Sequence, residues 1–392
     1  MTAHDPIQGL GEALRNARVL VCAGTGGVGK TTVSAALAIR AAQAGRRTLV
    51  LTIDPARRLA DALGLEGLGS EPAPVSLGEG REPIPLEALM LDPKPTFDGL
   101  VERLAPDAAS RARVLDNKIY RHLSEALAGS AEYAALEQVR EAVESGRYDL
   151  VAVDTPPASH ALDFLSAPRR LRDFLEGRFV QTLLRPAMSA SRFGFKVFGR
   201  SLQRMLGLIE RIAGVGFLDD LTEFLSAVSD LTEGFQAGTA RVEDILVGED
   251  TRFVLVGGAH SGTEPGTLEF LEALDAEGAR LAAVVLNRIA PWPEDLDPDV
   301  AAGADVRADL ERLTEALAQA GSTAPEADAA CLEAILADAA HARRDLLETR
   351  RQLARRVEGR DVDFHEIAER ATEIEGLEGL LRIGDELVGA AA

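Results

Sequence analysis

A glycine-rich loop near the N-terminus carries the residue types that bind a polyphosphate. Residues 24–32 read GTGGVGKTT and match the pattern GxxxxGK[ST]. Glycines let backbone N–H groups converge on phosphate oxygens, because no Cβ stands in the way. The spacing places Lys30 within reach of the β- and γ-phosphates and the Thr31 hydroxyl where it would ligate Mg²⁺. The predicted nucleotide-binding residues of the loop are Gly24, Thr25, Gly26, Gly27, Val28, Gly29, Lys30, Thr31 and Thr32.

Two other interpretations of the loop are weaker. A glycine-rich turn that binds nothing would contain the same glycines, and residues 24–29 also fit GxGxxG, a dinucleotide-binding pattern. The Lys30-Thr31 pair argues against the dinucleotide pattern, which has no need of it. A plain turn does not require a strand before it and a helix after it, and the sequence predicts both.

The hydrophobic pattern predicts the strands and helices that must position the loop. Residues 18–23 (RVLVCA) form a short apolar run typical of a buried parallel strand, and residues 31–44 are alanine-rich and predict a helix. Further apolar runs predict strands at residues 47–53, 86–91, 148–153, 251–256 and 281–286. Strands that alternate with helices predict an α/β fold with a mostly parallel sheet flanked by helices.

Polar residues follow three of these predicted strands. Asp54 and Asp154 each come directly after a strand, and Asn287 and Arg288 follow the last one. The carboxyl ends of parallel strands meet at the edge of the sheet where ligands bind, so we expect these side chains to face one crevice. Carboxylates there suit phosphoryl transfer, which depends on positioning and charge stabilisation. Asp54 followed by proline would also suit an ordinary helix start.

Five motifs together resemble the ArsA family of anion-transporting and tail-anchored-protein-targeting ATPases, in the SIMIBI class of P-loop proteins. The loop resembles the deviant Walker A motif, and Asn287-Arg288 resembles the adenine-contacting position. Residues 54–63 (DPARRLADAL), 90–93 (MLDP) and 154–160 (DTPPASH) are similar to the family's switch I, MEIDP and switch II motifs. The motifs occur in family order between residues 18 and 290.

The resemblance implies a P-loop NTPase fold, ATP and Mg²⁺ as ligands, and roles for single residues. Asp54 would orient and deprotonate the attacking water, and Lys30 would be the second catalytic residue. Asp154 would hold Mg²⁺ through a water, and Asn287, with Arg288 beside it, would select adenine. The family also forms dimers around nucleotide, so a homodimer or a heterodimer with a paralogue is implied.

Thr25 departs from the family, whose loops carry a signature lysine that crosses the dimer interface to the partner's nucleotide. Threonine cannot supply charge to a developing transition state. A paralogous subunit could donate the lysine, Arg57 or Arg58 could substitute for it, or turnover could be slow. The two cysteines, Cys22 and Cys331, also provide no CxxC pair or cluster. We therefore expect no zinc clamp and no metalloid site.

The remaining sequence predicts a domain organisation. Residues 1–290 would form the ATPase domain with a helical insert at about 166–247, residues 291–300 a linker, and residues 301–392 a helical C-terminal region. Within the insert, residues 169–211 hold ten basic and three acidic side chains together with phenylalanines and methionines. Such a segment suits a hydrophobic client or a peripheral membrane contact. It equally suits a core face backed by solvated arginines.

Charge and composition limit the class of function. The net charge of −21 argues against nucleic acid as a partner. Neither a signal-peptide pattern nor a long apolar run is visible, which predicts a cytoplasmic protein. Two functions follow: an ATP-hydrolysing switch that handles a hydrophobic or membrane-associated client, or a low-turnover, nucleotide-sensing subunit that regulates a catalytic paralogue.

Overall fold

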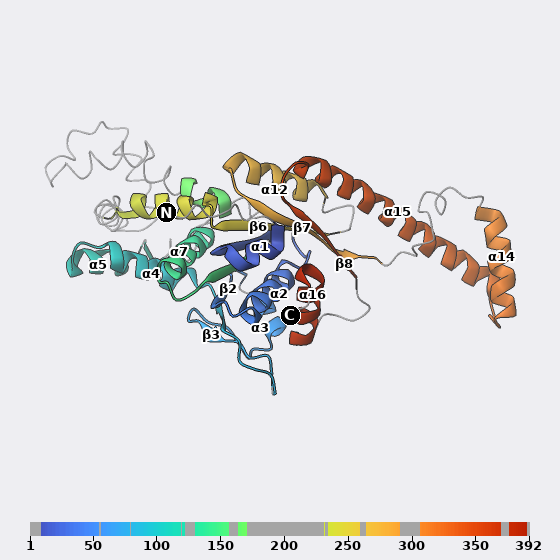
Figure 1. The fold of residues 1–392 in the computed structure, drawn as a ribbon, viewed down its shortest axis with the longest axis horizontal. Helices are drawn as coiled ribbons and strands as arrows, with labels where there is room; N and C mark the ends of the chain where they lie inside the picture. The colour runs from blue at the N-terminus through green and yellow to red at the C-terminus, as the bar shows by residue number, and fades with distance from the viewer. Residues whose placement is uncertain are drawn as a thin grey trace, which may run out of the picture.

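One eight-stranded sheet organises the molecule, in the order β3-β4-β2-β5-β1-β6-β7-β8 (Figure 1). The computed structural model describes residues 9–54, 56–78, 80–118, 120–121, 130–156, 164–170, 231, 234–258, 264–290, 306–369 and 376–389. All neighbouring strands are parallel except β3 and β4. The strands are β1 (Val19–Gly24), β2 (Thr48–Thr52), β3 (Ala73–Pro74), β4 (Leu86–Met90), β5 (Leu150–Asp154), β6 (Thr251–Gly258), β7 (Leu281–Ile289) and β8 (Asp363–Ala368).

Helices cover both faces of the sheet, as the predicted α/β fold requires. On one face lie α1 (Gly9–Asn16), α2 (Lys30–Gln43), α3 (Arg58–Leu63) and α16 (Gly376–Val388). On the other lie α4 (Pro93–Leu104), α7 (Ser130–Glu144), α12 (Glu264–Glu277) and the C-terminal half of α15 (Pro325–Val357). The central strands β1, β2 and β5 are buried along their whole length, which explains why they read as continuous apolar runs.

Two helical regions extend from this core. α5 (Ala108–Leu115) follows α4, and α14 (Val306–Gln319) packs against α15. Figure 1 shows α14 and the N-terminal half of α15 projecting away from the sheet. No helix in the described part of the chain combines the length and apolarity that a bilayer span requires.

The C-terminal region at residues 301–392, predicted to be helical, contains a strand as well as helices. β8 pairs in parallel with β7, with Asp363 opposite Ala283, and so extends the sheet beyond the last predicted strand. α16 then packs on α2. β8 lies at the sheet edge, and Ile367 is its only fully buried residue, so the sequence lacks the apolar run by which the other strands were found.

Other predicted segments lie outside the described residues. They are the linker at residues 291–300 and most of the basic, apolar stretch at residues 169–211. Of that stretch the structure describes Arg169 and Arg170. Arg169 forms an ion pair with Glu277 at 2.9 Å.

Candidate functional site

The glycine-rich loop joins the end of β1 to the start of α2, where its glycines are required by close contacts. Gly24 has φ 156°, and a Cβ there would lie 1.9 Å from the Val256 carbonyl oxygen of β6. Gly29 has φ 93°, and a Cβ there would lie 2.3 Å from the Asn287 side-chain nitrogen. The loop therefore sits tightly against β6 and β7. Its Gly26 and Gly27 are exposed, so the backbone of this part of the loop is accessible to a ligand.

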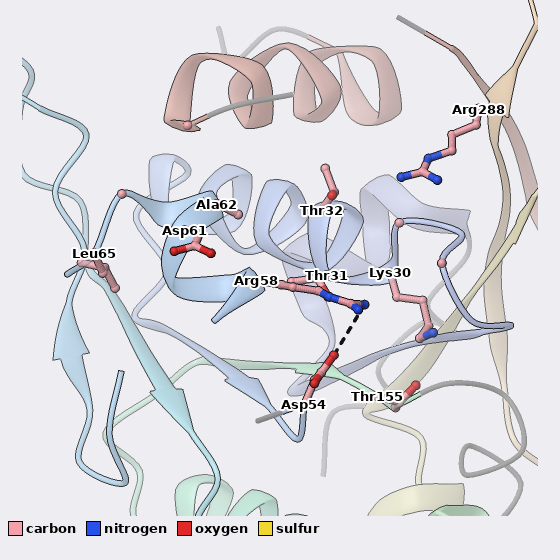
Figure 2. A pocket seen from close by; sticks show the side chains of 14 residues that line it. Lys30, Thr31, Thr32, Asp54, Arg58, Asp61, Ala62, Leu65, Thr155 and Arg288 are labelled. Carbon is pink, nitrogen blue, oxygen red and sulfur yellow. Dashed lines mark ion pairs between the residues drawn. The ribbon is translucent and has the colours of Figure 1, made fainter. Parts of the chain in front are cut away.

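A cavity of about 900 Å³ opens over the loop and the start of α2. Its volume suits a nucleotide-sized ligand. Figure 2 shows the side chains that face it from α2, α3 and the ends of β2, β5 and β7. The lining residues are Gly27, Gly29, Lys30, Thr31, Thr32, Asp54, Arg58, Asp61, Ala62, Gly64, Leu65, Thr155, Arg288 and Gly376.

Lys30 is the first residue of α2 and lies almost fully buried at the base of the cavity. Its Nζ donates a hydrogen bond of 2.8 Å to the Thr25 carbonyl oxygen, so the ammonium group folds back onto its own loop. Burial lowers the pKa of Lys30, while the nearby carboxylates of Asp154 and Asp54 act in the opposite direction. An anionic ligand would relieve this desolvation by pairing with the ammonium group.

Asp154 lies beneath the loop at the end of β5, with 1% of its surface exposed. Its Oδ2 accepts hydrogen bonds from the Thr31 hydroxyl at 2.7 Å and the Thr52 hydroxyl at 3.0 Å. Its Oδ1 is buried and has no hydrogen-bond partner among the described residues. Burial raises the pKa of Asp154 to about 6, although both hydroxyls stabilise the ionised form. This carboxylate next to the Thr31 hydroxyl offers the oxygen ligands that Mg²⁺ prefers, so the residues fit the ion.

Asp54 follows β2 and lines the same cavity. Its backbone N–H donates to the Thr52 hydroxyl at 3.2 Å, and its Oδ1 accepts from the Ala56 N–H at 2.9 Å. Its Oδ2 lies 3.7 Å from a guanidinium nitrogen of Arg58. The Thr52 hydroxyl thus contacts both the Asp154 carboxylate and the Asp54 backbone, and so links the positions of the two acids.

Asn287 and Arg288 sit at the end of β7 and play two different parts. Asn287 donates a hydrogen bond of 2.8 Å to the Val28 carbonyl oxygen and accepts one of 2.9 Å from the Arg288 N–H. These contacts fasten the loop to β7. Arg288 has φ 59°, in the left-handed region, and Figure 2 shows its side chain directed toward the cavity. The role of Asn287 in adenine selection stays a prediction.

Thr25, predicted to stand where the family carries its signature lysine, does not line the cavity. Its Oγ1 is buried without a hydrogen-bond partner among the described residues. A Cβ added to Gly266 of α12 would lie 2.7 Å from Thr25 Cγ2, so the side chain packs against that helix. Thr25 therefore contributes a backbone carbonyl to Lys30, and its side chain supplies nothing to a ligand in the cavity.

The structure brings most of the predicted site residues to one cavity and adds others. The predicted residues that line it are Gly27, Gly29, Lys30, Thr31, Thr32, Asp54 and Arg288. Gly24, Thr25, Val28, Asn287 and Asp154 are not in the lining and lie behind it, and Gly26 is exposed outside the lining. Sequence reasoning assigned no role to three contributors, which are Thr52, Thr155 and Gly376. Thr52 and Thr155 lie at strand ends beside the two acids, a position that could have indicated them. Gly376 lies far along the chain, and no sequence signal connects it to the loop.

A family model and several known proteins match this chain in sequence. A family model described as anion-transporting ATPase matches residues 17–297. A protein of Streptomyces coelicolor, named only as uncharacterized, is 32% identical over 72% of this chain and 64% of its own length. An ATPase GET3 from Mycosarcoma maydis is 29% identical over 50% of this chain and 51% of its own length. A putative arsenical pump-driving ATPase from Prosthecochloris vibrioformis is 34% identical over 39% of this chain and 36% of its own length.

The relatives and the family model match different shares of the chain. The chain spans between about half and two thirds of the length of the first two of these relatives. The family model, in contrast, covers most of the chain, including every strand from β1 to β7. The resemblance drawn from the sequence motifs is therefore confirmed, and the chain belongs to the anion-transporting ATPase family, the ArsA family.

Proposed function

We propose that this protein is a magnesium-dependent molecular switch that binds and hydrolyses ATP. The observation that carries the proposal is the Asp154 carboxylate beneath the loop. One of its oxygens is shared by the Thr31 and Thr52 hydroxyls, and the other is buried without a partner among the described residues. A buried oxygen of this kind is costly unless a ligand satisfies it, and a hydrated Mg²⁺ would do so.

Four side chains of the site, those of Lys30, Thr31, Asp54 and Asp154, have a part in this function. On ATP binding, Lys30 would exchange the Thr25 carbonyl for the β- and γ-phosphates, and exposed N–H groups of the loop would receive further phosphate oxygens. Asp54 would orient the attacking water and accept its proton. A bound Mg²⁺ would neutralise charge on the β- and γ-phosphates. Thr31 and Asp154 would fix its place.

Isothermal titration calorimetry with ATP and Mg²⁺ tests the binding part of this proposal. We expect Lys30→Ala to weaken ATP binding on the order of 10- to 100-fold, because a charge-assisted contact to phosphate is lost. Lys94→Ala is the matched control, since Lys94 pairs with Asp98 on α4 and does not line the cavity. No measurable heat for the unaltered protein, or equal heat for Lys30→Ala, would exclude the proposed site.

We further propose that the nucleotide state controls binding of a hydrophobic or membrane-associated client by the basic, apolar stretch at residues 169–211. Support comes from the composition of that stretch and from its place shortly after the Asp154 motif in the sequence. Deletion of residues 178–204 should abolish retention of an apolar peptide or of lipid vesicles and should leave ATP binding intact. Unchanged retention would remove this part of the proposal.

The second candidate function is a low-turnover, nucleotide-sensing subunit of a heterodimer. It is favoured by Thr25, whose side chain packs against α12 and brings no charge toward a nucleotide. A steady-state ATPase assay of the isolated protein, with and without a purified paralogue, separates the two functions. Turnover by the isolated protein supports the hydrolysing switch. Binding without turnover until the paralogue is added supports the regulatory subunit.

A further inference from the structure

We infer that Arg58 supplies, from within the same chain, the positive charge for phosphate transfer that Thr25 does not provide. This inference rests on the proposed hydrolysis of ATP and names the residue that completes its site. It is carried by the position of the Arg58 guanidinium group at the open side of the cavity, opposite the loop.

The structure distinguishes Arg58 from its neighbour Arg57. Arg58 is the first residue of α3 and lines the cavity, whereas Arg57 is the residue preceding the helix and does not line it. Figure 2 shows the Arg58 side chain extending from α3 across the cavity, with its guanidinium group above Asp54 and facing Lys30. Its side chain is 65% exposed, so it is free to change partners when a ligand enters.

Arg288 is the other arginine at the cavity, and its place differs. It comes from β7, next to the Asn287 that fastens the loop, and it enters the cavity from the far side. Arg58, in contrast, lies 3.7 Å from Asp54, the acid predicted to orient the water. Of the two arginines, Arg58 is therefore the one next to the reacting end of the phosphate chain.

Two cations that face one another across a cavity repel unless an anion lies between them. Lys30 and Arg58 are placed in this way, and the γ-phosphate is the group that the loop would deliver between them. In the structure Arg58 pairs instead with Asp54, at a separation that exceeds hydrogen-bond length. Such a solvent-exposed pair is weak, and a phosphate competes with it easily.

The exchange of partners by Arg58 would have two effects on the reaction: it would place positive charge on the γ-phosphate, and it would release Asp54 to the water. The water oxygen forms a bond to the γ-phosphorus, the bond from that phosphorus to the β,γ-bridging oxygen breaks, and a proton of the water passes to Asp54. The products are ADP and inorganic phosphate. Arg58 donates to γ-phosphate oxygens as their charge is redistributed, and its departure leaves the Asp54 carboxylate available to the water.

The test compares Arg58→Ala with the matched control Arg57→Ala. We expect Arg58→Ala to lower kcat at least about 100-fold with ATP affinity unchanged within a few-fold, because an arginine of this kind acts on the transition state. Arg57→Ala should retain the kcat of the unaltered protein within about 2-fold. Arg58→Lys should recover part of the lost rate, since it restores the charge without the planar fork.

A transition-state analogue gives a second readout that does not depend on a fast basal rate. Arg58→Ala should weaken binding of ADP, Mg²⁺ and aluminium fluoride far more than binding of ATP and Mg²⁺, both measured by calorimetry. Equal weakening of the two, or a kcat within about 3-fold of the unaltered protein, overturns the inference, as does a loss confined to Arg57→Ala. Failure of the unaltered protein to bind ATP would instead overturn the proposed function itself.

Discussion

The base of the nucleotide cavity is built from buried groups, whereas its rim is built from groups open to solvent. Lys30 and Asp154 at the base are 7% and 1% exposed and are held by hydrogen bonds to the loop and to two hydroxyls. Asp54 and Arg58 at the rim have side chains that are 22% and 65% exposed and are paired only loosely. The groups expected to bind the phosphates are thus fixed by the core before a ligand arrives.

The groups at the rim are exposed and are not fixed in this way, and we expect base and rim to have different functions. Groups that must reorient during hydrolysis cannot be locked by packing, and a switch needs an element whose position changes with the ligand. The comparison predicts that changes at the rim alter the rate of turnover, while changes at the base alter affinity. Three substitutions test this division, and a fourth tests the edge of the sheet.

The largest expected effect is that of Asp54→Asn at the rim. We expect kcat to fall on the order of 100- to 1,000-fold, because the water loses the group proposed to accept its proton. ATP affinity should stay within a few-fold of the unaltered protein, as measured by calorimetry. A comparable loss of affinity would show that Asp54 belongs with the base and would break the division.

The next effect is that of Asp154→Asn at the base. Removing the carboxylate should weaken the Mg²⁺-dependent part of ATP binding on the order of 10- to 100-fold. Because burial raises the pKa of this acid to about 6, its ionised form destabilises the ligand-free protein at neutral pH. The stability that the protonated form contributes is present below about pH 4 and is lost as pH rises through about 6.

Asp154→Asn should therefore raise the melting temperature of the ligand-free protein at pH 7.5, although it weakens ligand binding. Differential scanning calorimetry without nucleotide measures this. A lower melting temperature would mean that the hydroxyls of Thr31 and Thr52 compensate the buried charge more fully than the pKa shift indicates.

A smaller effect is expected from Gly384→Val, which acts on the support of the base. A Cβ at Gly384 of α16 would lie 2.5 Å from Arg40 Cγ on α2, so a larger side chain must displace the Arg40 side chain or push the two helices apart. Overpacking of this kind costs about 1–3 kcal/mol. We expect a lower melting temperature and weaker ATP binding, with kcat at saturating ATP unchanged. A changed kcat would show that the support of α2 also governs the rim.

The smallest effect concerns pH and the edge of the sheet. His365 of β8 is partly buried, its Nε2 has no hydrogen-bond partner among the described residues, and burial lowers its pKa while Asp363 opposes the shift. The stability gained from the neutral ring is therefore present above the ordinary histidine pKa and is lost as pH falls through the lowered value. His365→Gln should flatten the pH dependence of the melting temperature between pH 7 and about 5. An unaltered profile would contradict the assignment.

The sequence was sufficient for the parts of the site that depend on local pattern. The loop, Asp54 and Asp154 follow from short motifs after apolar runs, and parallel strands must bring their ends together. It could not choose between Arg57 and Arg58, because the choice depends on how α3 is oriented over the cavity. It also did not predict β8, because an edge strand with little buried surface has no apolar run. It did not predict that Gly376 lines the site, because that approach depends on the tertiary fold.

The packing of α16 on α2 also has a consequence for how the protein is made. The helix that follows the phosphate loop emerges early from the ribosome, but α16 and β8 are synthesised only after the rest of the sheet. Until then the apolar surface of α2 that meets α16 is open to solvent or to chaperones. Nascent chains stalled before β8 should therefore bind nucleotide poorly. Nucleotide binding by a nascent chain would then indicate that translation has passed α16.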